Sequence, residues 1–259
     1  MQETVPIFSS HYSIGRSILT LDVETNEKGE NIYEIKNNHP VSIISIVKIH
    51  NLKQIFLIDS SFSGFSEAYR NLTATDVQLI YGIKLHICED INDKSDKGRV
   101  NDSKIYLIAR NKDGLKELMK TYSRAATDSF YYYPRLDWNQ LNKISENIVI
   151  WIPFYDGFIH NNLLKYGVSI IPKFNRMPKF CIERHDLPFD DIIKEGIINY
   201  CNEMSYETIN THQIYYYKDD DARAMQVARC INNRSTLNKP NLSHFSSDSF
   251  SFESWGKSS

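Results

Sequence analysis

The stretch Ser103–Trp138, SKIYLIARNKDGLKELMKTYSRAATDSFYYYPRLDW, decides the fold of this chain. Its segment 104–109 is mostly apolar and bounded by polar residues, which is typical of a buried strand. After a polar turn, Leu115, Leu118, Met119 and Tyr122 recur at the spacing of one helix face. An aromatic Pro-Arg-x-Asp segment closes the stretch. It therefore predicts a strand, a helix and an aromatic segment in that order.

The same alternation of short apolar runs and helical patterns continues along the chain, which indicates an α/β fold. Strands are expected at Val5–Ser9, Gln54–Asp59, Val77–Cys88, Lys104–Ala109, Asn147–Ile152, Lys179–Glu183 and Glu207–Thr211. Helices are expected near Val41–His50, Ser63–Leu72, Asp113–Ala125, Gly157–Tyr166, Phe189–Met204 and Asp220–Ile231. Periodicity alone fits both a closed barrel and a doubly wound open sheet.

Composition narrows the class of protein. The 259 residues can bury a large core, and 41% hydrophobic content is typical of a globular chain. The net charge of −2 excludes a global field that attracts nucleic acid. The four cysteines, Cys88, Cys181, Cys201 and Cys230, form no CxxC pair, which favours buried free thiols in a reducing compartment. With no signal peptide and no apolar run of membrane-spanning length, we expect a cytoplasmic protein.

Several motifs occur in an order that is similar to one known family. They are FSSHYSIGRSIL (8–19), QIFLIDSSFSGFSEA (54–68), QLIYGIKLHIC (78–88), SFYYYPRLD (129–137) and the segments 147–164 and 211–231. Together they resemble the PHP (polymerase and histidinol phosphatase) domain of bacterial DNA polymerase III alpha subunits. The resemblance implies a distorted seven-stranded (β/α) barrel of PHP type.

The resemblance also suggests how the chain is organised. Residues 1–236 are expected to form the PHP-like barrel domain. Residues 237–259 are expected to form a Ser-rich tail that docks on the barrel through its aromatic side chains, Phe245, Phe250, Phe252 and Trp255. The polar segment Thr20–His39 predicts a hairpin around Lys28 and Gly29.

In the PHP family, imidazole, carboxylate or thiolate groups at the strand ends hold two or three divalent ions that activate water. Aligned on this chain, those positions hold Ile7, Ser9, Arg16, Asp59, Ser60, Lys84, Lys104, Phe154, Gln213 and Tyr215. Only Asp59 keeps a family ligand. Ammonium and guanidinium groups cannot coordinate Zn²⁺ or Mn²⁺, and their fixed positive charge repels the ion.

We therefore predict no metal, no other cofactor and no catalytic residue. The remnant is a vestigial cleft of Ser9, His11, Arg16, Asp59, Ser60, Lys84, Phe154, His212 and Gln213. Because a buried unpaired carboxylate is costly, we expect Lys84 or Arg16 to pair with Asp59. A residual mononuclear site of His11, Asp59 and His212 is the alternative.

Two surface patterns leave alternatives open. Lys112, Lys116, Lys120 and Arg124 recur every four residues, which fits a solvated helix face or a face for nucleic acid or an acidic partner. Tyr131, Tyr132, Tyr133 and Trp138 fit packing within the fold or stacking on bases.

The resemblance implies a non-catalytic structural or assembly module of a DNA polymerase III alpha type replicase, acting in DNA replication. Its expected partners are the replicative polymerase or other replisome proteins, with DNA as a further candidate. The chain ends close to where the family's polymerase core would begin, so we expect a stand-alone or split-off domain, encoded by a bacteriophage and present in the host cytoplasm. The alternatives are a metal-dependent phosphoesterase or 3′–5′ exonuclease with a rebuilt site, and a DNA-binding accessory factor.

Overall fold

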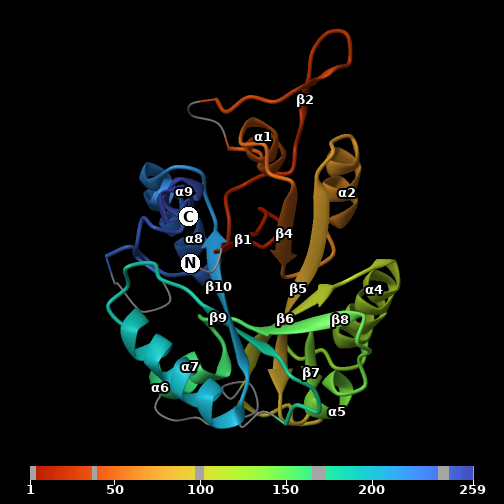
Figure 1. Cartoon of the computed structure of the whole chain (residues 1–259), viewed down its shortest axis with the longest axis vertical. Helices are drawn as coiled ribbons and strands as arrows, with labels where there is room; N and C mark the ends of the chain where they lie inside the picture. Colours follow the sequence, from red (N-terminus) through yellow and green to blue (C-terminus); the bar gives the residue numbers. More distant parts are fainter. Residues whose placement is uncertain (1–3, 37–39, 97–101, 165–172, 239–244, 259) are drawn as a thin grey trace. The chain divides into compact units, whose positions relative to one another are not determined.

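The structure is a computed structural model that describes residues 4–36, 40–96, 102–164, 173–238 and 245–258. Two compact units divide the chain. Unit 1 comprises Met1–Tyr81, Arg184–Leu187 and Thr211–Ser259, and unit 2 comprises Gly82–Glu183 and Pro188–Asn210. Strands and helices alternate in both units (Figure 1), which confirms the α/β class.

Unit 1 is built on parallel strands. Strand β1 (Val5–Phe8) pairs with β4 (Gln54–Asp59) on one side and with the second half of β10 (Glu207–Ile214) on the other. The start of β5 (Gln78–Cys88) belongs to the same unit, and β4 pairs with β5. Because neighbouring strands are parallel, the residues that follow β1 and β4 emerge at the same edge of the sheet.

The helices of unit 1 are α1 (Ile43–Ile49), α2 (Phe65–Thr73), α8 (Ala222–Asn233) and α9 (Phe252–Ser258), and a short 3₁₀ turn, Asp219–Asp221, leads into α8. The described part of the tail packs inside this unit. Phe252 stacks on Phe8 with ring centroids 6.1 Å apart, and the indole Nε1 of Trp255 donates a hydrogen bond to the carbonyl of Thr4. The division into residues 1–236 and 237–259 stays a prediction.

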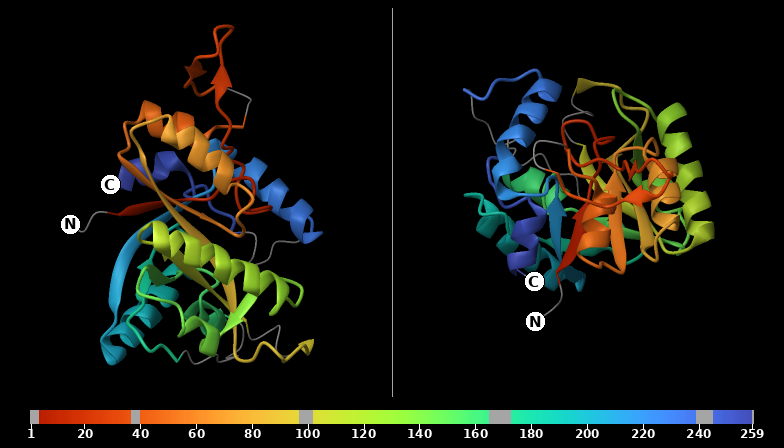
Figure 2. Two further views of the ribbon diagram at one scale, coloured as in Figure 1. Left: turned by 90° about the vertical axis from the view of Figure 1, so that its right-hand side faces the viewer. Right: turned by 90° about the horizontal axis from the view of Figure 1, so that it is seen from above.

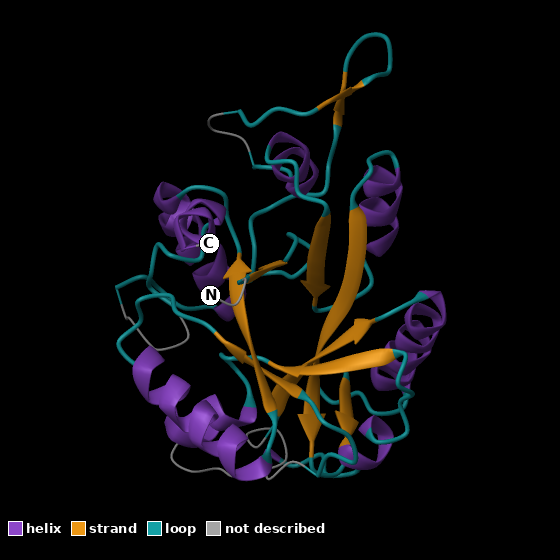
Figure 3. Ribbon diagram, in the orientation of Figure 1, coloured by secondary structure: helices purple, strands orange, loops and turns teal. Residues whose placement is uncertain are grey.

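The predicted hairpin is present in unit 1. Strands β2 (Glu24–Thr25) and β3 (Asn31–Ile32) pair antiparallel, as Figure 3 shows at the top of the view. Gly29 takes the left-handed conformation that the turn requires, with φ +79°.

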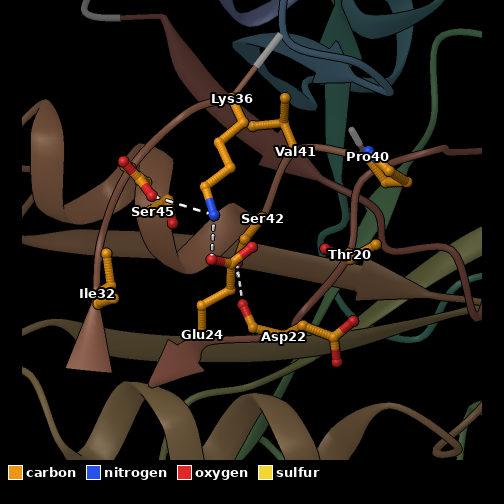
Figure 4. A pocket seen from close by; sticks show the side chains of 10 residues that line it. Thr20, Asp22, Glu24, Ile32, Lys36, Pro40, Val41, Ser42 and Ser45 are labelled. Atoms are coloured by element: carbon orange, nitrogen blue, oxygen red, sulfur yellow. Dashed lines mark hydrogen bonds and ion pairs between the residues drawn. The ribbon is translucent and has the colours of Figure 1, made fainter. Parts of the chain in front are cut away.

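Beside the hairpin lies a cavity of about 210 Å³ (Figure 4). The ammonium of Lys36 forms ion pairs there with Glu24 and, at 3.1 Å, with Glu34.

Unit 2 is built on a mixed sheet. Its strands are the second part of β5, β6 (Ser103–Ala109), β7 (Arg135–Asp137), β8 (Ile148–Ile152), β9 (Lys179–Ile182) and the first half of β10. The pairs β5–β6 and β6–β8 are antiparallel, whereas β5–β7, β8–β9 and β9–β10 are parallel. Strands β5 and β10 each contribute residues to both units. Each strand in the order β4-β1-β10-β9-β8-β6-β5 pairs with the next, and β5 also pairs with β4.

The helices described in unit 2 are α4 (Lys112–Thr127), α5 (Trp138–Leu141), α6 (Phe158–Leu164) and α7 (Asp190–Met204). Helix α4, yellow-green in Figure 2, packs on β6 and begins at Asn111, whose side chain accepts a hydrogen bond from the amide of Gly114. Gly114 is required there, because a Cβ would lie 2.2 Å from the carbonyl oxygen of Asn147. This close approach fixes α4 against the segment that precedes β8.

Two predictions from composition can be compared with the structure. All four cysteines are buried free thiols, as expected. Burial raises the pKa of Cys88 to about 12, so its thiol is protonated and unreactive at neutral pH. Within the described ranges, no helix is long and apolar enough to cross a membrane.

Candidate functional site

Asp59, which the resemblance aligns with a family ligand, is the last residue of β4 and is fully buried. The segment that follows β1 surrounds its carboxylate. The amide and hydroxyl of Ser10 donate hydrogen bonds of 2.8 and 2.7 Å, and the hydroxyl of Ser13 donates a third of 2.7 Å. We call Ser10, Ser13 and Asp59 the serine cage. Its donors satisfy both carboxylate oxygens without any positive charge.

Burial raises the pKa of Asp59 above its ordinary value, and the hydrogen bonds from Ser13 and Ser10 offset part of this shift. No lysine or arginine in the described part of the chain forms an ion pair with Asp59. The predicted pairing of Arg16 with Asp59 within unit 1 is therefore wrong, because the serine side chains of the segment after β1 occupy the carboxylate oxygens. Lys84, the other predicted partner, belongs to unit 2 and pairs there with Asp156.

Four other predicted residues of unit 1 lie close to the serine cage. Ser60 follows Asp59, and its amide donates to the Ser13 hydroxyl at 3.0 Å, while the hydroxyl of Ser9 donates to the carbonyl of Ile58 at 2.8 Å. The His11 ring contacts that of Tyr12, with centroids 4.3 Å apart. The electrostatic interaction of His11 with Asp59 opposes part of the rise in the pKa of Asp59. Arg16 is half-buried, and its amide donates to the carbonyl of Ser13.

His212 and Gln213 lie on β10 and are buried. The His212 ring contacts that of His185, with centroids 4.5 Å apart, and Gln213 accepts a hydrogen bond from the hydroxyl of Tyr215. Among the described residues, no three His, Cys, Asp or Glu side chains are placed to hold a metal ion. The alternative of a mononuclear site made of His11, Asp59 and His212 is therefore wrong for this arrangement.

Unit 2 contains a different cluster, which includes Lys84 and Lys104, two residues that the sequence resemblance predicts at metal-ligand positions of the family. The ammonium of Lys104 lies 3.1 Å from the Asp156 carboxylate, and that of Lys84 lies 3.4 Å from the same oxygen. These side chains are mostly buried, with 11% of Lys84 and 18% of Lys104 and Asp156 exposed. We call the three residues the Lys–Asp–Lys cluster. Two protein cations share one carboxylate there.

Strand register explains how the cluster forms. Lys84 on β5 lies directly opposite Tyr106 on β6, and its ammonium stands 5.5 Å from the centre of that ring. Lys104 is two residues before Tyr106, so both lysines extend from the same face. Asp156 follows β8, and its carbonyl accepts a hydrogen bond from the Lys104 amide at 2.9 Å. This bond fixes the carboxylate beside the lysines.

The donor set of the described residues does not fit the ions that the PHP family holds. The ammonium groups of Lys84 and Lys104 have no lone pair to donate, and Phe154, which the resemblance aligns with a ligand cysteine, is a fully buried aromatic ring. Phe154 packs edge-on against Tyr155 with centroids 4.9 Å apart. These positions therefore offer no ligands for a polynuclear metal centre among the described residues.

The sequence grouped nine residues into one vestigial cleft. Ser9, His11, Arg16, Asp59, Ser60, His212 and Gln213 belong to unit 1, whereas Lys84 and Phe154 belong to unit 2. Sequence reasoning missed Ser10, Ser13 and Asp156. A usable signal existed for Asp156, because it lies two residues after Phe154, a position already aligned with a ligand.

The cationic row on α4 is exposed, whereas the aromatic residues 131–133 and 138 include both packed and exposed side chains. Lys112, Lys116, Lys120 and Arg124 are all exposed on α4. Tyr133 packs in the fold, stacked on His86 at 3.6 Å, and Tyr131 contacts the guanidinium of the buried Arg135. Tyr132 is 64% exposed. Trp138, which begins α5, is buried.

Comparison with known proteins identifies the relatives of this chain. The family model described as the PHP domain matches residues 37–187, more than half of the chain. The DNA polymerase III subunit alpha of Borreliella burgdorferi is 26% identical over 201 residues, covering 73% of this chain and 17% of the relative. One from Helicobacter pylori is 28% identical over 223 residues, covering 76% and 18%. One from Aquifex aeolicus is 22% identical over 221 residues, covering 78% and 19%.

The chain thus spans less than a fifth of the length of these curated relatives. The family match and the pairing order agree with the fold expected from the sequence, a distorted seven-stranded (β/α) barrel of PHP type. The relatives support a role associated with DNA replication.

Proposed function

Because the chain belongs to the PHP domain family, we propose that it acts in DNA replication as a non-catalytic structural and assembly module. The observation that carries this proposal is the Lys–Asp–Lys cluster. It puts two ammonium groups, 3.1 and 3.4 Å from one carboxylate, at positions where the family carries metal ligands. Fixed cations there repel the divalent ions that the phosphoesterase reaction of the family needs.

The partner in this proposal is a replicative DNA polymerase or another replisome protein. The curated relatives are named DNA polymerase III subunit alpha, and this chain matches less than a fifth of each. In this proposal the module assembles with the polypeptide region that carries the polymerase activity their name states. The well-packed cores of the two units suit a scaffold, which needs a stable surface and no reactive group.

An activity assay tests the non-catalytic part. The full-length protein is incubated with Mn²⁺ or Zn²⁺ and either p-nitrophenyl phosphate or a 3′-labelled single-stranded DNA. We expect no turnover above the buffer blank. The matched control is Asp59→Asn, which removes the one family ligand that the chain keeps. Metal-dependent hydrolysis that this substitution abolishes would instead support the phosphoesterase or exonuclease alternative.

A second experiment tests the assembly part. The tagged full-length protein is captured from the cells in which it is naturally made, and the bound proteins are identified by mass spectrometry. We expect an alpha-type polymerase polypeptide or another replisome protein to be enriched over a tag-only control. Enrichment of no replication protein, at a capture yield that recovers the tagged chain, would contradict the assembly role.

A further inference from the structure

A cavity lined by charged side chains lies beside α4 in unit 2, with a volume of about 340 Å³. Lys120 and Arg124 line it from α4, and Lys143 lines it from the segment after α5. Leu136 and Ile144 contribute apolar surface. A cavity of this volume is at the small end of ligand pockets, which span roughly 300–1,000 Å³, so it suits a single small group.

The charge of the residues that line this cavity is net positive. Lys120, Arg124 and Lys143 form no ion pair and no side-chain hydrogen bond within the residues that the structure covers. The one carboxylate of the lining, Glu117, accepts a 2.8 Å hydrogen bond from the amide of Ser145 and another from its hydroxyl. Three cations and one engaged carboxylate leave a net charge of +2 at the cavity.

The inner wall is apolar. Leu136, on β7, is 2% exposed, and Ile144 is 9% exposed, so both are fixed by the core of the unit. A ligand that fills such a site combines an anionic group with a flat apolar one. Inorganic anions would leave the apolar wall uncovered, whereas a nucleotide unit satisfies both parts.

We propose that this cavity binds a nucleotide unit, with the phosphate held by Lys120, Arg124 and Lys143 and the base packed against Leu136 and Ile144. A free nucleotide and a single DNA strand share this chemistry. This proposal does not depend on the assembly role proposed above. Of the four cations in the α4 row, only Lys120 and Arg124 line the cavity. Lys112 and Lys116 do not line the cavity, and Lys116 pairs with Asp113 at 3.3 Å.

Fluorescence anisotropy with a labelled oligothymidylate tests the site in the full-length protein. The variant Lys120→Ala/Arg124→Ala/Lys143→Ala should weaken binding about tenfold or more at low salt, because it removes the three cations that contact the phosphate. Its slope of log affinity against log salt concentration should fall by about 2, at roughly 0.7 for each lost phosphate contact with a single strand. All three residues are exposed, so the variant should keep the wild-type melting temperature.

The matched control is Lys112→Ala/Lys116→Ala, which removes two cations from the same row but outside the cavity. We expect it to weaken binding no more than about twofold. A second variant, Thr121→Phe, fills the cavity while every charge stays, and it should weaken binding without changing the salt slope.

Competition separates the sources of the ligand. Displacement of the probe by thymidine monophosphate assigns a free-nucleotide site, and displacement by unlabelled oligothymidylate alone assigns a strand site. If the cavity variant and the control weaken binding equally, the proposal is overturned. Binding would then depend on the overall positive charge of the α4 surface and not on the cavity. Displacement by polyglutamate as effective as by the oligonucleotide would also overturn it and favour an acidic protein partner.

Discussion

Asp59 and Asp156 are both carboxylates in a fold whose family holds metal ions, yet their surroundings differ in kind. Asp59 is fully buried and accepts three hydrogen bonds from uncharged donors of Ser10 and Ser13. Asp156 is 18% exposed and shares one oxygen between the ammonium groups of Lys84 and Lys104. The first carboxylate is stabilised by hydrogen bonding and the second by charge.

This difference shows two ways in which the fold stabilises a carboxylate that has little contact with solvent. Hydroxyl and amide groups of Ser10 and Ser13 enclose Asp59, whereas the Lys84 and Lys104 ammonium groups face Asp156. The serine cage tolerates a neutral Asp59, because burial raises its pKa and favours the protonated form. The Lys–Asp–Lys cluster favours the negative charge of Asp156, because its carboxylate lies within 3.4 Å of both ammonium groups.

The largest effect is expected from Asp59→Ala. The substitution leaves three buried donors without their acceptor, and each unsatisfied donor costs about 1–3 kcal/mol. We expect the free energy of unfolding to fall by at least about 3 kcal/mol, measured by urea denaturation followed by circular dichroism. A loss below about 1 kcal/mol would mean that the serine cage does not stabilise the unit.

The second largest effect is expected from Asp156→Asn. We expect the free energy of unfolding to fall by about 2 kcal/mol. This loss is smaller than for a fully buried ion pair, because the side chains of the cluster retain some contact with solvent. The matched control is Asp186→Asn. Both aspartates adopt positive φ, 64° for Asp156 and 55° for Asp186, but Asp186 meets Arg184 on the surface, with side chains 70% and 79% exposed. The control should change stability by no more than about 0.5 kcal/mol. Equal effects at both positions would show that the charge of Asp156 is not needed.

Asp102, a third buried carboxylate, should give a pH-dependent effect of intermediate size. Burial raises the pKa of Asp102 from 3.8 to about 6, with Tyr133 and Arg135 opposing part of the shift. Between about pH 4 and pH 6 the unfolded chain releases this proton while the folded chain keeps it, so stability falls as the pH rises. Asp102→Asn should remove this dependence, so its stability relative to wild type should improve from about pH 4 to about pH 7 in urea titrations. If the difference in stability between Asp102→Asn and wild type is the same at both pH values, the raised pKa of Asp102 is contradicted.

Asp59→Asn should have a small effect, below about 1 kcal/mol at neutral pH, because the hydroxyl of Ser10 can turn and accept from the new amide. The pKa of Asp59 is raised, so the wild type loses stability as the pH rises from the ordinary aspartate value to the raised one. The asparagine variant should lack that loss. Urea midpoints across the acidic range measure it, and a variant as unstable as Asp59→Ala would show that the cage needs the negative charge.

The smallest effect is expected from Lys36→Ala in the hairpin cavity. Here one ammonium lies between Glu24 and Glu34, the reverse of the Lys–Asp–Lys cluster, and the side chains are 40–56% exposed. Solvent screens such pairs, so the urea midpoint should not change measurably. A clear decrease would show that exposure does not set the difference between these clusters.

Much of the fold could be predicted from periodicity. The strand Gln54–Asp59 and the hairpin around Gly29 were predicted with correct positions. Strand β7 (Arg135–Asp137) and helix α5 (Trp138–Leu141) were missed, because elements of three or four residues are too short to show a period. Both are fixed by tertiary contacts, which a local pattern does not encode.

The candidate site was predicted only in part. The assignment of Lys84 and Phe154 to former ligand positions rests on the resemblance and stays a prediction. The cation beside Asp59 was predicted wrongly, because its place was assigned from charge alone while Ser10 and Ser13 lie next to it in the chain fold. Lys143 was missed because it joins the α4 cations only through the packing of separate elements.

Metal content tests the replacement of the metal site by protein groups most directly. The full-length protein is purified from medium supplemented with zinc and manganese, dialysed against metal-free buffer and measured by plasma mass spectrometry. Charge compensation by Lys84 and Lys104 predicts well below one bound ion per chain. Two or more retained ions per chain would contradict it.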